Sequence, residues 1–322
     1  MTDFKKLAKP FLVLAPMDDV TDTVFRRIVA DCAAPDLYIT EFVNVDGLQS
    51  PGREKLLPKL QFTDEERPII AQLWGKDPKN YYEVAKQIKQ MGFDGVDINL
   101  GCPDKAVIKN GCCIALINNR ELTGEIIQAV REGVGPDFPV SVKTRLGLQQ
   151  IDYTWHEFLL NQKLNMLSIH GRTAKQMSKV PADWEAINHI REMRDFLFPA
   201  TLIVGNGDVQ NRKQAHGLAN KYKLDGIMIG RGIFEDPFAF ATESPWQQWT
   251  EEQKIQLYAK HVKLFVETWH NQERRLHTLN KFCKIYINGF DGAKELRDQL
   301  MHAKSADELL GLLTGEARPR TV

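Results

Sequence analysis

The sequence predicts an α/β protein in which a closed (β/α)₈ TIM barrel is followed by a small C-terminal all-α helical domain. Eight short, apolar, β-branched runs alternate with longer amphipathic stretches, the pattern of βα units around a parallel sheet. The first run leads into Ala15-Pro16-Met17-Asp18 and not into the G-x-G-x-x-G of an open dinucleotide-binding sheet. The number and even spacing of the runs therefore favour a closed barrel over a doubly wound sheet.

The predicted strands are all short, apolar and followed by a polar or Gly/Pro break, and they span residues 11–15, 37–41, 69–73, 96–100, 140–143, 167–170, 202–205 and 226–230. The stretches between them carry helical signals. Residues 21–30, for example, open on Thr-Asp and place Val24, Ile28 and Val29 on one face, which predicts an amphipathic helix.

The pattern changes after Phe240. Ser244-Pro245-Trp246 breaks the chain, and Thr250-Glu251-Glu252 is typical of a helix N-terminus with acidic residues in its first turn. Apolar residues then recur at helical spacing over residues 257–266, 276–287 and 296–300, before a polar end from Gly315. We therefore expect a barrel domain over residues 1–243 and a helical domain over residues 244–322.

The composition is that of a globular enzyme or binding protein, with 322 residues, 43% hydrophobic and 26% charged. Lys and Arg number 42, as do Asp and Glu, so the net charge is zero. This balance argues against a protein whose whole surface binds nucleic acid, but it leaves room for a local basic patch. The apolar run at residues 11–15 is too short for a signal peptide or a membrane span, so we expect a cytoplasmic protein, by default a monomer.

Five cysteines in a chain long enough to bury a core predict neither a disulfide framework nor, at their spacings, a zinc site. Cys102 stands out because Gly101 and Pro103 place it in a fixed loop after the fourth run. A thiol with an ordinary pKa of about 8.5 can donate a proton at neutral pH, although a small apolar filler is the alternative. The adjacent Cys112 and Cys113 lack that loop and are expected to be structural, and the remaining two, Cys32 and Cys283, to lie in the core.

Polar residues recur at the C-terminal ends of the predicted strands, where barrels of this kind place their active sites. Any one of them alone is an ordinary strand-end residue, but their repetition at one end indicates a shared pocket. Together with Pro16 and Met17 the set comprises Glu41, Gln72, Asn99, Cys102, Lys143, Arg145, His170, Arg172, Asn206, Asp208 and Arg231.

The seventh and eighth strand ends carry Gly205-Asn206-Gly207-Asp208 and Gly230-Arg231-Gly232. Glycines there let backbone amides approach a ligand, and Arg231 adds a positive charge, so we expect a phosphate site beside a short extra helix. Tight βα turns are the alternative. Lys143, at the end of the fifth run, points a cation into the barrel mouth, where it could neutralise an anion or form a Schiff base as in an aldolase.

Six motifs in order make the chain similar to the bacterial tRNA-dihydrouridine synthases, and the resemblance spans essentially the whole sequence. They are Ala15-Pro16-Met17, Asp97-Ile98-Asn99-Leu100-Gly101-Cys102-Pro103, Val142-Lys143-Thr144-Arg145, His170-Gly171-Arg172-Thr173, Gly205-Asn206-Gly207-Asp208 and Ile229-Gly230-Arg231-Gly232. One departure is Gly111-Cys112-Cys113-Ile114-Ala115, which is bulkier than the glycine- and alanine-rich turn usual in that family.

The resemblance implies an FMN-dependent enzyme that uses NADPH to reduce the 5,6 double bond of particular uridines in the tRNA D-loop. Gln72 would then bind the pyrimidine edge of the flavin, and Lys143 would lie where negative charge gathers on the reduced ring. By their places in the matching motifs, the FMN-binding residues would be Pro16, Met17, Asp18, Gln72, Lys143, His170, Asn206, Gly207, Asp208, Gly230 and Arg231, the last five at the phosphate.

For the substrate, the resemblance implies that reduced flavin passes a hydride to one carbon of the uracil double bond while Cys102 protonates its neighbour. A base flanked by both donors must be extruded from the folded tRNA. Candidates for holding the base and its phosphate from the rim of the pocket are Asn99, Arg145 and Arg172. In the helical domain, Lys281 and Lys284 are the candidates for contact with tRNA, although their charges could equally form a solvated face.

Two other functions fit part of the pattern. An FMN barrel acting on a small molecule, of the dihydroorotate-dehydrogenase or ene-reductase type, would share the phosphate loops and Lys143, but the helical tail and the Gly-Cys-Pro loop argue against it. A non-catalytic RNA-binding or assembly protein on a relic barrel would have no need of Cys102, Lys143 and both phosphate loops.

Overall fold

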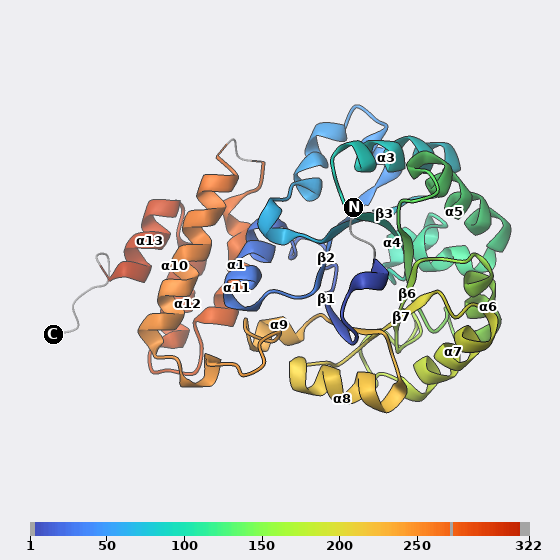
Figure 1. The fold of residues 1–322 in the computed structure, drawn as a ribbon. Helices are drawn as coiled ribbons and strands as arrows, with labels where there is room; N and C mark the ends of the chain where they lie inside the picture. The colour runs from blue at the N-terminus through green and yellow to red at the C-terminus, as the bar shows by residue number, and fades with distance from the viewer. Residues whose placement is uncertain (1–3, 271–272, 316–322) are drawn as a thin grey trace.

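In the computed structural model, which describes residues 4–270 and 273–315, eight parallel strands close into a barrel in sequence order (Figure 1). Each strand pairs with its neighbours along the chain, and β1 also pairs with β8. The predicted barrel is therefore confirmed. Its strands are β1 (Phe11–Leu14), β2 (Leu37–Asn44), β3 (Ile69–Trp74), β4 (Gly95–Leu100), β5 (Val140–Arg145), β6 (Met166–His170), β7 (Leu202–Asn206) and β8 (Gly226–Ile229).

Helices surround the barrel and then continue beyond it. Those within the barrel region are α1 (Thr23–Ala33), α2 (Val45–Leu48), α3 (Pro78–Gln90), α4 (Lys105–Lys109), α5 (Arg120–Val134), α6 (Tyr153–Asn161), α7 (Trp184–Leu197), α8 (Arg212–Tyr222) and α9 (Gly232–Glu235). The C-terminal helices are α10 (Glu251–Thr268), α11 (Asn280–Tyr286), α12 (Ala293–His302) and α13 (Ala306–Thr314). Within the described ranges, no helix is both long and apolar enough to cross a membrane.

The strands bury both of their faces, because alternate residues belong to two separate cores. Phe11 and Val13 of β1 belong to a small cluster with Ile39 and Val204, whereas Leu12 and Leu14 pack in the larger cluster with the helices. Apolar side chains thus fill the barrel interior toward the N-terminal ends of the strands. The polar residues at the C-terminal ends form the mouth at the other end.

Strand β2 is longer than predicted. It runs to Asn44, and its register against β3 shifts between Ile39 and Phe42. A register shift of this kind resembles a β-bulge, in which the strand continues but the direction of one side chain changes. Glu41 lies at this shift, within the strand and completely buried.

The C-terminal helices pack beside α1 at one side of the barrel (Figure 1). Thr250 and Gln253 form a capping box that starts α10, as the sequence predicts. Phe25 of α1 stacks on Phe282 of α11 with ring centroids 5.0 Å apart, and Asp31 pairs with Lys260 at 2.7 Å. Helix α13 was not predicted, yet its leucines Leu309, Leu312 and Leu313 are buried at helical spacing.

Candidate active site at the barrel mouth

A cavity of about 620 Å³ opens at the C-terminal ends of the strands. It is the pocket that the polar strand ends predict, because residues from the first strand and from the fifth to the eighth strands converge on it. The predicted site residues that line it are Pro16, Met17, Lys143, Arg145, His170, Arg172, Asn206, Gly207, Asp208, Gly230 and Arg231. The sequence prediction missed other lining residues, among them Met177, Ser178, Gln210, Phe234 and Glu235.

The loop after β7 forms a close-packed turn on one wall of this cavity. Gly207 has a φ of 136°, and a Cβ atom there would lie 2.6 Å from the Cβ of Ala182, so only glycine fits. Gly232, which starts the short helix α9, is equally constrained, since its Cβ would lie 2.5 Å from the carbonyl oxygen of Val209. The two glycine loops therefore approach each other beside a short helix, as a phosphate site in a barrel requires.

Asp208 organises the arginines of this wall. Its carboxylate accepts a hydrogen bond from Arg172 and one of 2.9 Å from the amide of Ala182, and it lies 3.4 Å from Arg231. Burial opposes its ionisation, but these hydrogen bonds and charges hold the pKa of Asp208 below its ordinary value. The Arg231 side chain is 63% exposed, which leaves its guanidinium accessible to a ligand.

The cavity carries an excess of positive charge. Burial, followed by the neighbouring Arg145, lowers the pKa of Lys143 to about 8. Burial and then the charges of Lys143 and Arg145 lower the pKa of His170 to about 2, so this imidazole is neutral at physiological pH. A pocket in which cations depress one another's pKa values is suited to an anionic ligand.

The loop of Cys102 lies against the same strands. Among the described residues, Cys102 itself is not one of those that line the cavity. The side-chain oxygen of Asn99 accepts hydrogen bonds of 3.0 Å from the amides of Gly101 and Cys102. Arg145 donates a 2.9 Å bond to the carbonyl of Gly101, so a cavity residue also holds the loop. A hydrogen bond with the Cys113 thiol, opposed by burial, lowers the pKa of Cys102 to about 7.

Asn99 belongs to a buried chain of polar side chains that crosses three strands. It donates a 2.9 Å bond to Gln72, which donates a 2.7 Å bond to Asp97, whose other oxygen accepts a 2.5 Å bond from Ser141. Burial raises the pKa of Asp97 to about 6, against the opposing effect of these hydrogen bonds. The sequence prediction missed Asp97 and Ser141, although an acid inside an apolar strand is a signal that could have found them.

Two of the three residues expected on the rim of the pocket are buried. Asn99 is 6% exposed and Arg172 is 3% exposed, although Arg172 still lines the cavity. Asn99 is drawn inward by Gln72, and Arg172 by Asp208 together with the carbonyl of Val180, to which its Nε donates a 2.5 Å bond. Arg145, the third of these candidates, is half-buried and also lines the cavity.

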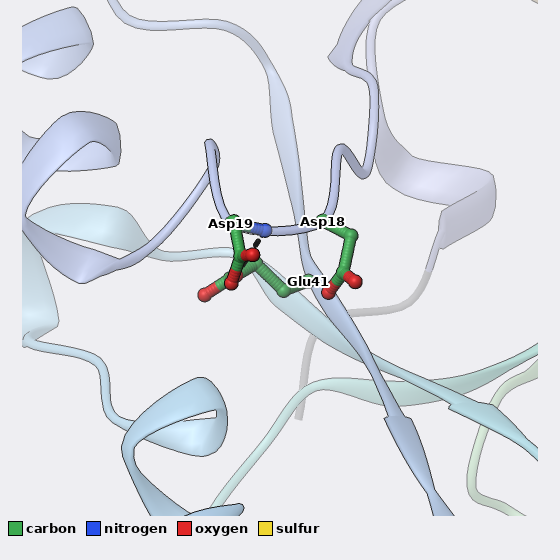
Figure 2. A group of neighbouring side chains, drawn as sticks. All are labelled: Asp18, Asp19 and Glu41. Atoms are coloured by element: carbon green, nitrogen blue, oxygen red, sulfur yellow. Dashed lines mark hydrogen bonds between the residues drawn. The ribbon is translucent and has the colours of Figure 1, made fainter. Parts of the chain in front are cut away.

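Asp18 lies in a carboxylate cluster with Asp19 and Glu41, shown in Figure 2. The amide of Asp19 donates a 2.7 Å hydrogen bond to Glu41. Lys59 hydrogen-bonds to Asp18 and lies 3.8 Å from Asp19, and Arg274 pairs with Glu41. Side-chain cations thus already neutralise the cluster, and the Asp18 carboxylate is engaged there and not among the residues lining the main cavity.

Lys281 and Lys284 line a second cavity of about 770 Å³, between the region of α9 and helix α11. Phe234 and Glu235 belong to the walls of both cavities, which makes the two adjacent. Trp249 and Lys254 also line it, and the sequence prediction missed them. Lys281 donates a 2.6 Å hydrogen bond to the carbonyl of Asp19, so helix α11 is tied to the loop that follows β1.

Comparison with known proteins places this architecture in a family. Residues 13–320 match the family described as "Dihydrouridine synthase (Dus)". A protein of Staphylococcus aureus (strain COL) named "Probable tRNA-dihydrouridine synthase" is 43% identical over 313 residues, which cover 96% of this chain and 94% of the relative. The "Probable tRNA-dihydrouridine synthase 2" of Bacillus subtilis (strain 168) is 43% identical over 314 residues, covering 96% and 95% of the two chains.

Among solved structures, morphinone reductase aligns with a TM-score of 0.52 at 14% identity, over 74% of this chain and 86% of that chain, which shows a shared fold. The family match extends over nearly the entire sequence, from the first strand to beyond the last described helix. The chain therefore belongs to the dihydrouridine synthase family.

Proposed function

We propose that this protein is a tRNA-dihydrouridine synthase that reduces the C5–C6 double bond of specific uridines in the D-loop, with FMN as cofactor and NADPH as reductant. The observation that carries the proposal is the cationic cavity at the barrel mouth, with the Cys102 loop held against it by Arg145. Family membership and the names of the relatives support the reaction.

The cavity residues fit FMN. Its phosphate would lie between the loop at Gly207 and the start of α9, where Arg231 is exposed. The Asp208 carboxylate is bonded to Arg172, so Asp208 would contact the phosphate through its backbone amide. Lys143 would oppose negative charge on the flavin ring. Gln72 donates one Nε2 hydrogen to Asp97 and accepts one bond at Oε1 from Asn99, and its amide has a second hydrogen and a second lone pair with which to contact the flavin.

In the reaction, bound FMN supplies the hydride. Cys102 supplies the proton from its Sγ to the adjacent carbon, so that the uracil gains two hydrogens and the thiol becomes a thiolate. Asn99 and Arg145 hold the loop that carries this thiol through bonds to Gly101 and Cys102. Arg145 and Arg172 provide the positive charge that a nucleotide phosphate at the cavity would meet.

The tRNA would lie across both cavities. A uridine extruded into the first cavity places neighbouring phosphates near Lys281 and Lys284 of the second, and Trp249 offers an aromatic side chain of the kind that stacks on bases. We accordingly assign catalysis to a domain of residues 1–243 and tRNA binding to a helical domain of residues 244–322. As its substrate is cytoplasmic, we propose that the enzyme acts there, as a monomer.

Mass spectrometry of nucleosides tests the reaction. Bulk tRNA that lacks dihydrouridine is incubated with purified protein and NADPH, and a gain of two hydrogens on uridine is expected. A yellow protein that NADPH bleaches, without that gain, would point to a small-molecule flavin oxidoreductase. A colourless protein that binds tRNA without modifying it would point to a non-catalytic RNA-binding protein.

A further inference from the structure

Asp97 is a completely buried carboxylate within the barrel, and the proposed reaction gives it no role. It lies on β4 two residues before Asn99, so both side chains leave the same face of the strand, whereas Ile98 packs in the larger apolar cluster on the other face. Gln72 of β3 pairs in register with Asp97 on one side, and Ser141 of β5 on the other. The closed barrel therefore brings four polar side chains together in its interior.

A chain of hydrogen bonds runs from the Cys102 loop to this carboxylate, and every bond has the same direction. The backbone N–H groups of Gly101 and Cys102 donate 3.0 Å bonds to Oδ1 of Asn99. Nδ2 of Asn99 donates a 2.9 Å bond to Oε1 of Gln72, and Nε2 of Gln72 donates a 2.7 Å bond to Asp97. We name this chain, from the two loop amides to Asp97, the amide relay.

The chemistry of its two ends allows only this direction. Backbone N–H groups donate and never accept, so Asn99 must turn its oxygen toward the loop and its NH₂ group toward Gln72. An ionised carboxylate accepts and never donates, so Gln72 must turn its NH₂ group toward Asp97. Among the residues that the structure describes, the buried side-chain nitrogens and oxygens without a hydrogen-bond partner include none of the relay. Because an unpaired buried polar group costs free energy, the carboxylate at the far end fixes the orientation of both side-chain amides.

We propose that Asp97 is a positioning residue of the reaction, which sets the direction of the amide relay and thereby holds the loop that carries Cys102. The direction of the relay follows from the hydrogen bonds alone, whereas its effect on uridine reduction rests on the proposed role of Cys102 as proton donor. Asp97 acts through Gln72 and Asn99, and Asn99 bonds the backbone amide of Cys102 itself.

A carboxylate sets this direction in a way that an amide does not. Ser141 donates a 2.5 Å bond to the second oxygen of Asp97, so both oxygens accept. An asparagine at position 97 could turn either its oxygen or its NH₂ group toward Gln72, because the Ser141 hydroxyl can both donate and accept. Burial raises the pKa of Asp97 to about 6, so the carboxylate is still ionised at neutral pH, as the relay requires.

Reversing the relay by substitution tests the proposal. Asn99→Asp places an acceptor at both ends, so Gln72 can offer its NH₂ group to only one of them. Adding Asp97→Asn supplies a donor at the far end. Gln72 can then rotate its amide, accept from residue 97 and donate to residue 99, which still accepts from the two loop amides. The double variant Asp97→Asn/Asn99→Asp keeps the net charge and the number of hydrogen bonds, with the two side-chain bonds reversed.

The rate of uridine reduction and the stability should both show this rescue. The FMN-loaded protein is reduced anaerobically with dithionite, so that reoxidation of the flavin by saturating tRNA lacking dihydrouridine reports transfer to uridine alone. In Asn99→Asp this rate should fall by about 10²-fold, the cost of displacing a reacting group by about 1 Å, and the urea midpoint should fall. Asp97→Asn alone should lose less, because one orientation of its amide retains the relay. The double variant should recover at least to the level of Asp97→Asn.

A matched control separates the direction of the hydrogen bonds from charge. Asp97→Leu/Asn99→Asp has the same net charge as the double variant, but its side chain at position 97 donates nothing to Gln72. It should stay as slow and as unstable as Asn99→Asp. If Asn99→Asp yields no folded protein, the rescue is measured as recovery of folded, FMN-loaded protein in the double variant and not in the leucine control.

The possible results decide between this inference and the proposed function. Losses that simply add in the double variant would overturn the inference, as would equal rescue by leucine, or an Asn99→Asp protein as fast and stable as the unmodified one. Recovery of the urea midpoint without recovery of the rate would keep the direction of the relay and refute its role in the reaction. An unmodified protein that never reduces uridine would refute the proposed function, and the urea midpoints would still decide the direction of the relay.

Discussion

Arg274 donates a hydrogen bond to Glu41, although 233 residues separate them in the sequence. The Glu41 side chain is completely buried and that of Arg274 is 8% exposed. Burial raises the pKa of Glu41, and the charge of Arg274 opposes this rise. The pair joins the segment before α11 to strand β2, next to the loop that leads from β1 into the active site.

Removing this arginine should destabilise the protein. Arg274→Ala leaves Glu41 buried without its partner, and loss of one member of a buried pair costs about 3 kcal/mol. A protonated Glu41 carries no buried charge, so uptake of a proton reduces the loss in free energy of unfolding. Protonation is favoured at low pH, and the variant should therefore lose more stability at pH 8 than at pH 5. Urea unfolding followed by circular dichroism measures both. The exposed neighbour variant Arg275→Ala is the control, and equal losses in the two variants would contradict the role of the ion pair.

Cys102→Ala should separate the two half-reactions. In the proposed mechanism, FMN binding and its reduction by NADPH use residues outside the Cys102 loop, so both should persist, while transfer to uridine should fall by about 10²-fold or more through loss of the general acid. Stopped-flow bleaching of the flavin and nucleoside mass spectrometry measure the two steps. The control is Cys112→Ser, because the Cys112 sulfur faces the carbonyl of Asn110. This variant should retain both flavin bleaching and uridine reduction. Full uridine reduction by Cys102→Ala would falsify the acid assignment.

The pH dependence of Cys102 should show its lowered pKa of about 7. Only the thiolate reacts with iodoacetamide, so the rate of Cys102 alkylation should rise with pH, with a midpoint near 7. It is followed on the tryptic peptide of residues 90–105. The proton donor is the other form, the thiol, and its fraction falls as pH rises through 7, so uridine reduction should decline there. In Cys113→Gly the hydrogen bond that lowers the pKa is gone, and both midpoints should move upward. Unchanged midpoints in that variant would contradict the contribution of Cys113.

Arg231→Ala should weaken the retention of FMN. A hydrogen bond to a charged group contributes about 1.5–3 kcal/mol, which corresponds to a roughly ten- to hundredfold increase in the dissociation constant. The flavin-to-protein ratio after purification and titration of the apoprotein with FMN measure it. Lys213→Ala, an exposed cation on the neighbouring helix α8, should bind FMN normally. A full flavin complement in Arg231→Ala would refute the phosphate contact.

Lys284→Ala should weaken tRNA binding without affecting FMN. Each phosphate contact made by a lysine contributes about one unit to the slope of log affinity against log salt, so the variant should show a shallower slope as well as a weaker affinity. Filter binding over a series of salt concentrations measures the slope. Lys263→Ala, an exposed lysine of α10 that lines neither the main nor the adjacent cavity, is the matched control. Identical slopes for both variants would remove Lys284 from the tRNA path.

The periodic part of the fold could be read from the chain because it is local. Alternation of apolar runs with amphipathic stretches predicted every strand of the barrel, and glycines with Arg231 indicated the wall where the loops after β7 and β8 meet. The extent of β2 was underestimated because its continuation depends on a register shift against β3, which the composition of β2 does not reveal. Helix α13 was missed although Leu309 and Leu312 carry a helical signal.

By itself, the sequence determined the fold class, the end of the barrel at which the cavity opens, and most of the residues that line the cavity. Only the tertiary structure decided which side chains meet. Gln72 bonds Asp97 because β3 and β4 pair with these two residues in register. Arg274 reaches Glu41 because α11 packs against α1 and is bonded to the loop that follows β1. Strand and helix periodicity arise from interactions between near neighbours in the chain. Contacts between distant residues depend on register and packing, which are settled only when the whole barrel and its C-terminal helices assemble.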